Sequence, residues 1–329
     1  MIGIFKQKSP VNFLLLLLFA VLIKLPMFLH PHLVSRHKGD SILYSAFIDF
    51  LEGKAVNFPS IYPLIAFTLL FLQSVILIRI INSHRMVNWT GYVPGMAYIL
   101  VTSLFPEWNY LSAPLIVNTI LLLALSGLLK IYNQQNAKST IFNIGLALGI
   151  AIFIFFPSFI FSFWILLGLM VMRPFRLNEW VLYLVGITTP FYFYAIYLFI
   201  SDQWSWQHLW PHFSVGLPLL KQSAWQAGSA FLLVVPFLAG GYFVQNNLRR
   251  MLIQVRKGWS LFLLYLLAAF LVPMISAGDT FEDWIMCAIP FAAFHACTYL
   301  YSTLRIFPLL IFWLTVAYVL AYQYYGPGW

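Results

Sequence analysis

The sequence has very little charge for its length. Of its 329 residues, only 8% are Asp, Glu, Lys or Arg, whereas 62% are hydrophobic, and the mean hydropathy is +0.87. A soluble domain carries roughly 25% charged residues to cover its surface. A water-facing exterior is therefore excluded, and we expect a single transmembrane domain over residues 1–329.

Cysteine and the common catalytic motifs are also scarce. Cys287 and Cys297 lie in one apolar run, where small packing residues are expected rather than metal ligands. The sequence contains no Walker-type loop, Gly-x-Ser-x-Gly elbow, Cys-x-x-Cys pair or Gly-x-Gly-x-x-Gly motif. The net charge of +9 is scattered between apolar runs, so no nucleic-acid partner is predicted.

Long apolar runs are abundant. A helix of about 20 residues crosses the hydrocarbon core of a bilayer, which predicts an all-α fold, a polytopic transmembrane helical bundle of about eleven spans. As one helix, the run from 140 to 172 would be about 50 Å long, so we predict two short spans separated at Pro157 and Ser158. The predicted spans lie near 11–29, 61–81, 90–105, 111–131, 140–156, 158–172, 179–200, 227–246, 259–276, 284–302 and 307–325.

The two charge signs separate across these spans. The side that carries the N-terminus holds 13 of the 18 Lys and Arg residues, which predicts a cytoplasmic N-terminus. The acidic turn formed by Asp279, Glu282 and Asp283 is expected to be solvated. The external face holds eight of the nine acidic residues and is the predicted place of any chemistry: Asp40, Asp49, Glu52, Glu107, Asp202, Asp279, Glu282 and Asp283.

An amphipathic surface helix is predicted in the first outer loop, residues 30–60. Between Asp40 and Gly53, apolar residues recur at helical spacing, at positions 43, 46, 47, 50 and 51. Asp40 suits the N-cap and Gly53 the C-terminal stop of a helix that lies on the membrane with its apolar face down. Asp40 is either a cap alone or a carboxylate that serves as general base or metal ligand.

This pattern resembles the GT-C glycosyltransferases, multi-spanning enzymes that use polyprenyl-phosphate-linked sugar donors. The resemblance begins with Asp40, followed by Tyr44 in the first outer loop. It covers most of the chain as a pattern of spans. Its further segments are Tyr62-Pro63, Leu104-Phe105-Pro106-Glu107 leading into Asn118-Thr119-Ile120-Leu121, Asn143-Ile144-Gly145 followed by Pro157, and Asp283-Trp284 leading to Pro290-Phe291.

The resemblance implies a site on the external face of a bacterial inner membrane. An acidic residue of the first outer loop in that family acts as base or helps to bind a divalent metal; Asp40 is the matching position, with Glu107 as a second acidic site. Arg36 and Lys38 are the predicted partners of the donor phosphate, because phosphate binding needs cationic donors. The implied ligands are membrane lipid and the polyprenyl-phosphate carrier with its sugar.

The chain departs from the family pattern at two points. Many members carry two adjacent acids in the first loop, whereas Gly39 and Ser41 flank Asp40 here. Many also have an outer domain that recognises the acceptor, for which this chain has no counterpart. The alternative function is therefore a non-catalytic membrane subunit of the same fold, which docks a partner protein that supplies acceptor recognition.

Tryptophan is concentrated in the second outer segment, residues 201–226. Trp204, Trp206 and Trp210 suit the membrane interface. Aromatic faces also stack on sugar rings, so these three residues and Tyr44 are candidates to contact a sugar or an acceptor.

Two other functions have less support. His208 and His212 have the i, i+4 spacing of a metal pair, but Pro211 between them interrupts a helix. No metal ligands are assigned, and a metal-dependent oxygenase is disfavoured because the remaining clustered histidines lie in a loop. A lipid transporter is disfavoured because few ionisable residues lie within the predicted spans.

Overall fold

The regular structure of the chain is helical throughout the part that the computed structural model describes. It describes residues 2–32, 34, 39–55, 58–132, 134–202, 223–276, 281–302, 304 and 306–326. Within these ranges, β pairing is limited to an isolated antiparallel bridge between Asp40 and Phe155. The predicted all-helical class is therefore confirmed.

The helices follow one another with short connections. The first half of the chain forms α1 (Ile2–Phe5), α2 (Pro10–Ile23), α3 (Pro26–Leu29), α4 (Ile42–Ala55), α5 (Ile61–Ser83), α6 (Val93–Thr102), η1 (Pro106–Asn109), α7 (Ala113–Ile131) and α8 (Lys138–Ile154). The second half forms η2 (Phe156–Ile160), α9 (Phe161–Met172), α10 (Leu177–Ile200), α12 (Ala224–Asn247), η3 (Leu248–Arg250), α13 (Ile253–Ser276), η4 (Glu282–Cys287), α14 (Ala288–Tyr301) and α15 (Ile306–Tyr325).

Many of these helices are suited to a bilayer. Seven segments in the described part are long and apolar enough to cross a membrane: α5, α7, α10, α12 with η3, α13, η4 with α14, and α15. Shorter apolar segments are α2, α6, α8, and η2 with α9. The chain is a multi-pass membrane protein, whereas the number of about eleven crossings stays a prediction. Between 140 and 172 the chain does form two helices, because Phe155 is extended (φ −144°, ψ 107°) and ends α8.

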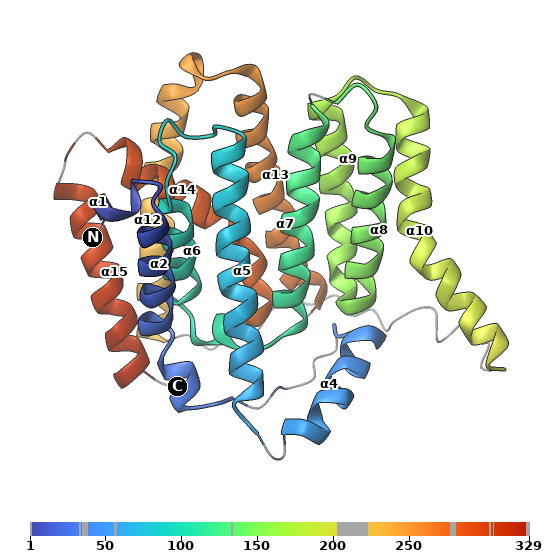
Figure 1. Ribbon diagram of the computed structural model, residues 1–329, viewed down its shortest axis with the longest axis horizontal. Coiled ribbons are helices and arrows are strands. Elements are labelled where there is room, and N and C mark those ends of the chain that lie inside the picture. Colours follow the sequence, from blue (N-terminus) through green and yellow to red (C-terminus); the bar gives the residue numbers. More distant parts are fainter. Residues whose placement is uncertain are drawn as a thin grey trace.

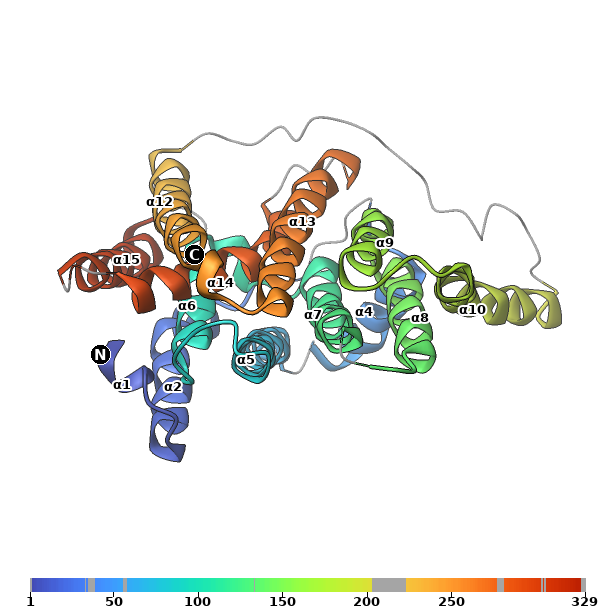
Figure 2. The same ribbon diagram turned by 90° about the horizontal axis from the view of Figure 1, so that it is seen from above.

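The helices stand side by side in an elongated bundle (Figures 1 and 2). α2, α12 and α15 lie toward one end of the long axis, and α8, α9 and α10 toward the other. Nearly every residue of α6 and α14 is buried, so the continuous apolar core runs through these two helices. The outermost helix, α10, is bent (Figure 1). It contains Pro190, which lacks a backbone N–H and so removes one hydrogen bond from the interior of the helix.

Buried polar side chains link four helices across this core. Tyr98 of α6 donates a hydrogen bond to Gln73 of α5, and Asn118 of α7 donates to the Tyr98 hydroxyl at 3.1 Å. The Tyr265 hydroxyl of α13 donates to Asn118 Oδ1 at 3.1 Å. Because lipid offers no hydrogen-bond partners, such groups must be satisfied within the protein. The network therefore fixes the relative placement of α5, α6, α7 and α13.

The described acidic residues are concentrated at one end of the helices, and most of the described basic residues at the other. We call the end with the α5–α6 and α12–α13 connections, at the top of Figure 1, the N-terminal end, and the opposite end, where α4 lies, the α4 end. Within the described residues, the acidic residue at the N-terminal end is Glu179, which pairs with Arg173 at 3.0 Å and Arg176 at 3.8 Å. Which end faces the cytoplasm stays a prediction.

The helix of the first outer loop exists, but its ends differ from the predicted ones. α4 begins at Ile42 and continues past Gly53 to Ala55. The Ser41 carbonyl accepts the first helical hydrogen bond, from the Ser45 N–H at 3.1 Å. Ser41 therefore occupies the N-cap position, and the prediction that Asp40 does so was wrong.

The structure shows which face of α4 packs against the protein, a point that the sequence pattern left open. Tyr44, Ile48 and Leu51 point into the protein, whereas Leu43 and Phe50 are exposed. Apolar residues occupy both faces of this helix, so the spacing alone did not decide which face would meet the protein. The exposed apolar face is the one available to lipid.

Candidate functional site

Asp40 lies where the first outer loop meets the turn between α8 and η2. The Ser41 N–H donates to the Ile154 carbonyl at 3.1 Å, and the Phe156 N–H donates to the Gly39 carbonyl at 3.2 Å. These two hydrogen bonds form the isolated bridge that centres on Asp40. The backbone of the half-buried Asp40 is therefore fixed at the α4 end, just before α4 begins.

Glycine at position 39 allows this close approach. A Cβ atom at Gly39 would lie 2.7 Å from Cε2 of the Phe155 ring. A side chain there would push the ring or the loop aside, and with it the adjacent carboxylate. Where many members of the family that the sequence resembles carry a second acid, this chain has Gly39, and the missing side chain allows the contact with Phe155 that positions the Asp40 backbone.

Tyr44 joins the Asp40 segment to the connection that contains Glu107. Its side chain is buried, and its hydroxyl donates to the Leu111 carbonyl at 3.2 Å. Leu111 follows η1, which contains Glu107. The two acidic positions predicted from the sequence therefore lie on segments that contact each other through α4, and Tyr44 is an internal link between those segments rather than an open aromatic surface.

Glu107 occupies a short 3-10 turn that Pro106 begins. Its carboxyl group is half-buried, and its Oε2 atom has no hydrogen-bond partner among the described residues. Burial raises the pKa of this carboxyl above its ordinary value, and the nearby Glu282 carboxylate raises it further, while the Glu107 backbone N–H and His32 lower it. A carboxyl in this state can exchange a proton nearer neutral pH than an exposed glutamate can.

Four side chains lie near Glu107: His32, Tyr110, Glu282 and Tyr322. His32 stacks on Tyr110 with ring centroids 4.1 Å apart. Burial raises the pKa of the Tyr110 hydroxyl, and the neighbouring Glu107, Glu282 and Tyr322 raise it further. We call Glu107, His32, Tyr110, Glu282 and Tyr322 the η1–η4 cluster.

The acidic turn before α14 is buried, so the expectation of a solvated turn was wrong for Glu282 and Asp283. Each is only 6% exposed, and Asp283 accepts a hydrogen bond from Ser276. The turn is held against η1, because the Trp108 indole N–H donates to the Phe281 carbonyl at 2.9 Å. Asp279, the third acid of that turn, lies outside the described residues.

Lys24 contributes a buried amine near the site, which was not predicted from the sequence. The first predicted span divides at this residue, where α2 ends before Pro26 begins α3. The Lys24 Nζ donates to Ser103 Oγ at 3.1 Å and to Asn109, two residues after Glu107. The sequence did contain a signal for this position, because Lys24 is an ionisable residue inside an apolar run. Such residues cost free energy in lipid and often mark functional sites.

An aromatic-lined cavity lies beside these polar groups. Its volume is about 200 Å³, and its exposed lining is apolar. On one side the cavity is lined by Trp108 of η1 and by Phe105, the residue before η1. On the other side it is lined by Phe281 and Trp284 at η4 and by Phe270 of α13. The carboxyl groups of η1 and η4 therefore lie on the same two turns as the walls of an apolar cavity.

Several predicted site residues lie outside the described part of the chain. These are Arg36 and Lys38, the predicted phosphate partners, and Trp204, Trp206 and Trp210. The same is true of His208 and His212. Among the residues that the structure describes, no group of three or more His, Cys, Asp or Glu side chains is placed to hold a metal ion.

The chain is similar in structure to a solved protein. No protein-family model and no curated protein matches the sequence. The fold is similar to the crystal structure of ArnT from Cupriavidus metallidurans bound to undecaprenyl phosphate, with a TM-score of 0.48 and 13% sequence identity. The match covers 89% of this chain and 60% of that chain, so this chain spans less than two thirds of its length.

Proposed function

We propose that this chain is a GT-C-like membrane glycosyltransferase that transfers a sugar from a polyprenyl-phosphate-linked donor at its α4 end. The observation that carries the proposal is the junction at Tyr44. There the segment with Asp40 meets the segment with the half-buried carboxyl of Glu107. The α4 end is taken to be the external face of the inner membrane of a bacterium, in keeping with the excess of basic residues at the other end.

Each part of the transfer reaction has a candidate group. The Asp40 carboxylate accepts the proton of the acceptor hydroxyl or amine, and the freed electron pair forms a bond to the anomeric carbon of the sugar. The bond between that carbon and the phosphate oxygen breaks, and polyprenyl phosphate leaves with its electron pair. Glu107 is assigned to orient the acceptor or the sugar, and Arg36 and Lys38 to stabilise the departing phosphate.

The aromatic cavity supports a lipid-linked donor. An apolar space of about 200 Å³ on the same turns as Glu107 and Glu282 suits the first isoprene units of such a donor. The Lys24 Nζ is held by two neutral side chains, Ser103 and Asn109, and so it also lies near the η1 turn of this site. The reaction as written needs no metal step.

The donor is tested by native mass spectrometry of the protein extracted gently from its own membrane. We expect bound polyprenyl phosphate or its sugar conjugate, with occupancy reduced in the R36Q/K38Q double variant. K54Q is the matched control, because Lys54 lies in the same loop but over the Phe50 ring at 4.2 Å. A protein that carries only bulk phospholipid, or a stoichiometric partner protein, would favour the non-catalytic subunit instead.

Catalysis is tested by Asp40→Asn, which keeps the shape of the side chain but removes the base. We expect D40N to bind the lipid-linked sugar as the wild type does and to turn it over roughly 10²-fold more slowly or worse. The released polyprenyl phosphate, measured by mass spectrometry in native membrane vesicles, reports the turnover. A folded D40N protein with full turnover would refute the role of Asp40.

A further inference from the structure

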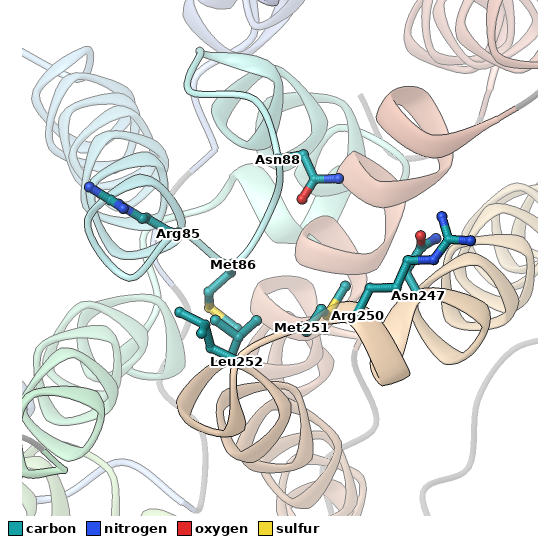
Figure 3. Close-up of a pocket in the computed structure, with 8 residues that line it drawn as sticks. Arg85, Met86, Asn88, Asn247, Arg250, Met251 and Leu252 are labelled. Atoms are coloured by element: carbon teal, nitrogen blue, oxygen red, sulfur yellow. The ribbon is translucent and has the colours of Figure 1, made fainter.

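A second cavity lies at the N-terminal end of the bundle, remote from the proposed transfer site. It has a volume of about 250 Å³ and opens between the α5–α6 connection and the α12–α13 connection (Figure 3). The first connection contributes Arg85, Met86 and Asn88 to its wall. Asn247, Arg250, Met251, Leu252 and Val255 come from the second. No proposed step of the transfer reaction uses this cavity.

The wall of this cavity is polar on one part and apolar on another. In Figure 3, Asn88, Asn247 and Arg250 lie toward one side of the view, and Met86 and Leu252 toward the other. The Arg85 side chain points away from this polar group. A ligand that fits both parts carries an anionic or hydrogen-bonding group next to an apolar one.

No described carboxylate neutralises the cations of this cavity. Among the described residues, neither Arg85 nor Arg250 has a carboxylate within ion-pair distance. Glu179, the acidic residue described at this end, is already paired with Arg173 and Arg176. An anion from outside the chain is therefore the available partner for Arg250.

The loop that carries Arg85 is held in a fixed geometry. The Arg85 N–H donates to the Asn82 carbonyl at 3.2 Å, and the Met86 N–H donates to the Ile81 carbonyl at 3.0 Å, which closes α5 with a Schellman motif. Arg85 has a φ of 49° at the position where such motifs favour glycine. The Asn88 N–H donates to the Tyr301 hydroxyl at 3.3 Å. The wall of the cavity therefore has a defined shape in the absence of ligand.

We propose that this cavity binds the phosphate headgroup of an anionic membrane lipid from the leaflet at the N-terminal end. Arg250 donates charge-assisted hydrogen bonds to the phosphate oxygens. The Asn88 amide donates as well, together with the second N–H of the Asn247 amide, whose first N–H donates to the Phe243 carbonyl at 2.8 Å. The glycerol and the first methylenes of the lipid pack on Met86, Met251 and Leu252. A lipid bound here bridges α5–α6 to α12–α13, the two connections that form the cavity.

The test compares two neighbouring arginines. Arg249 and Arg250 both lie exposed in η3, but only Arg250 lines the cavity. The full-length protein is placed in nanodiscs of phosphatidylcholine that contain a small fraction of phosphatidylglycerol, and the bound phosphatidylglycerol is counted by native mass spectrometry. R250Q should bind it about tenfold more weakly than the wild type, and R249Q nearly as well as the wild type, because the loss of a charged hydrogen bond changes affinity by that order.

Two results would overturn the proposal. Equal losses in R249Q and R250Q would mean that only the surface charge attracts the lipid. Saturable binding of inorganic phosphate that is lost in R250Q, together with phosphatidylglycerol binding that R250Q leaves unchanged, would mean that the cavity takes a soluble phosphate instead. N247L, which keeps every charge, should also weaken phosphatidylglycerol binding, and unchanged melting temperatures exclude misfolding of either variant.

Discussion

Burial sets the chemistry of the carboxyl group of Glu107. Its Oε2 atom has no hydrogen-bond partner among the described residues, and a second carboxylate, Glu282, lies close enough to oppose its ionisation. Both effects favour the protonated form. In the sequence, Glu107 is one acid in a short outer turn. Nothing in that local pattern indicates that its pKa is raised.

The pKa of Glu107 predicts a pH dependence of stability. A carboxyl whose pKa is raised on folding contributes stability that is fully present below its ordinary value of 4.5 and is lost as the pH rises through the raised value. Glutamine at this position cannot ionise, so E107Q should gain in melting temperature relative to the wild type between about pH 4 and pH 8. Thermal unfolding in detergent at the two pH values measures the difference.

The control for this prediction is E52Q, which removes the same charge from an exposed position on α4. If E107Q and the wild type kept the same difference in melting temperature at both pH values, the raised pKa of Glu107 would be wrong. If E52Q reproduced the shift, net charge rather than burial would be its cause.

At the scale of the helix, glycine decides how closely α8 and α10 approach. A Cβ atom at Gly145 would lie 2.4 Å from the Tyr183 carbonyl oxygen, and one at Gly186 would lie 2.6 Å from the Phe142 carbonyl oxygen. In lipid, helices associate through such close backbone packing rather than through the hydrophobic effect. α10 has few buried residues elsewhere, so this contact holds it to the bundle.

Substitution of Gly186 by Ala should therefore destabilise the attachment of α10. The new methyl group meets backbone atoms, which cannot rotate away, and overpacking of this kind costs about 1–3 kcal/mol. Gly241→Ala in α12 is the matched control, because nothing lies within 4 Å of a Cβ atom there. Denaturant unfolding in detergent compares the two variants with the wild type, and equal stability of G186A and G241A would refute the packing role.

At the scale of the whole molecule, the separation of charge is the feature that bears on orientation. Basic residues lie at the ends of α5, α7 and α9 and at the beginnings of α8 and α13, all at the N-terminal end. The acids of η1 and η4 lie at the α4 end. The positive-inside tendency then predicts that the proposed transfer site faces outward.

Single introduced cysteines test this orientation. Gly53 in α4 and Asn136 in the α7–α8 connection are exposed at opposite ends, and the native Cys287 and Cys297 are buried and give little background. We expect a membrane-impermeant maleimide to label G53C in intact cells and N136C only after permeabilisation. The opposite pattern would place the proposed site on the cytoplasmic side and exclude the transfer reaction at an external face.

The sequence by itself determined the class of the molecule and its division into helices. Low charge and repeated apolar runs force a helical membrane fold, because only helices of this length satisfy their own backbone in lipid. The division of the 140–172 run was predicted from its length, and the helix of the first outer loop from the helical spacing of its apolar residues. The ends and the buried face of α4 were not, since apolar residues occur on both of its faces.

Only the tertiary structure decided which polar residues meet. Glu107, His32, Glu282 and Lys24 come from four separate connections or helix ends, and no spacing along the chain reports their distance in space. Burial of Glu282 and Asp283 depends on the packing of η4 against η1, which local pattern does not encode. Periodicity records what one segment prefers, whereas the pKa of a carboxyl and the shape of a cavity are set by neighbours that only folding brings together.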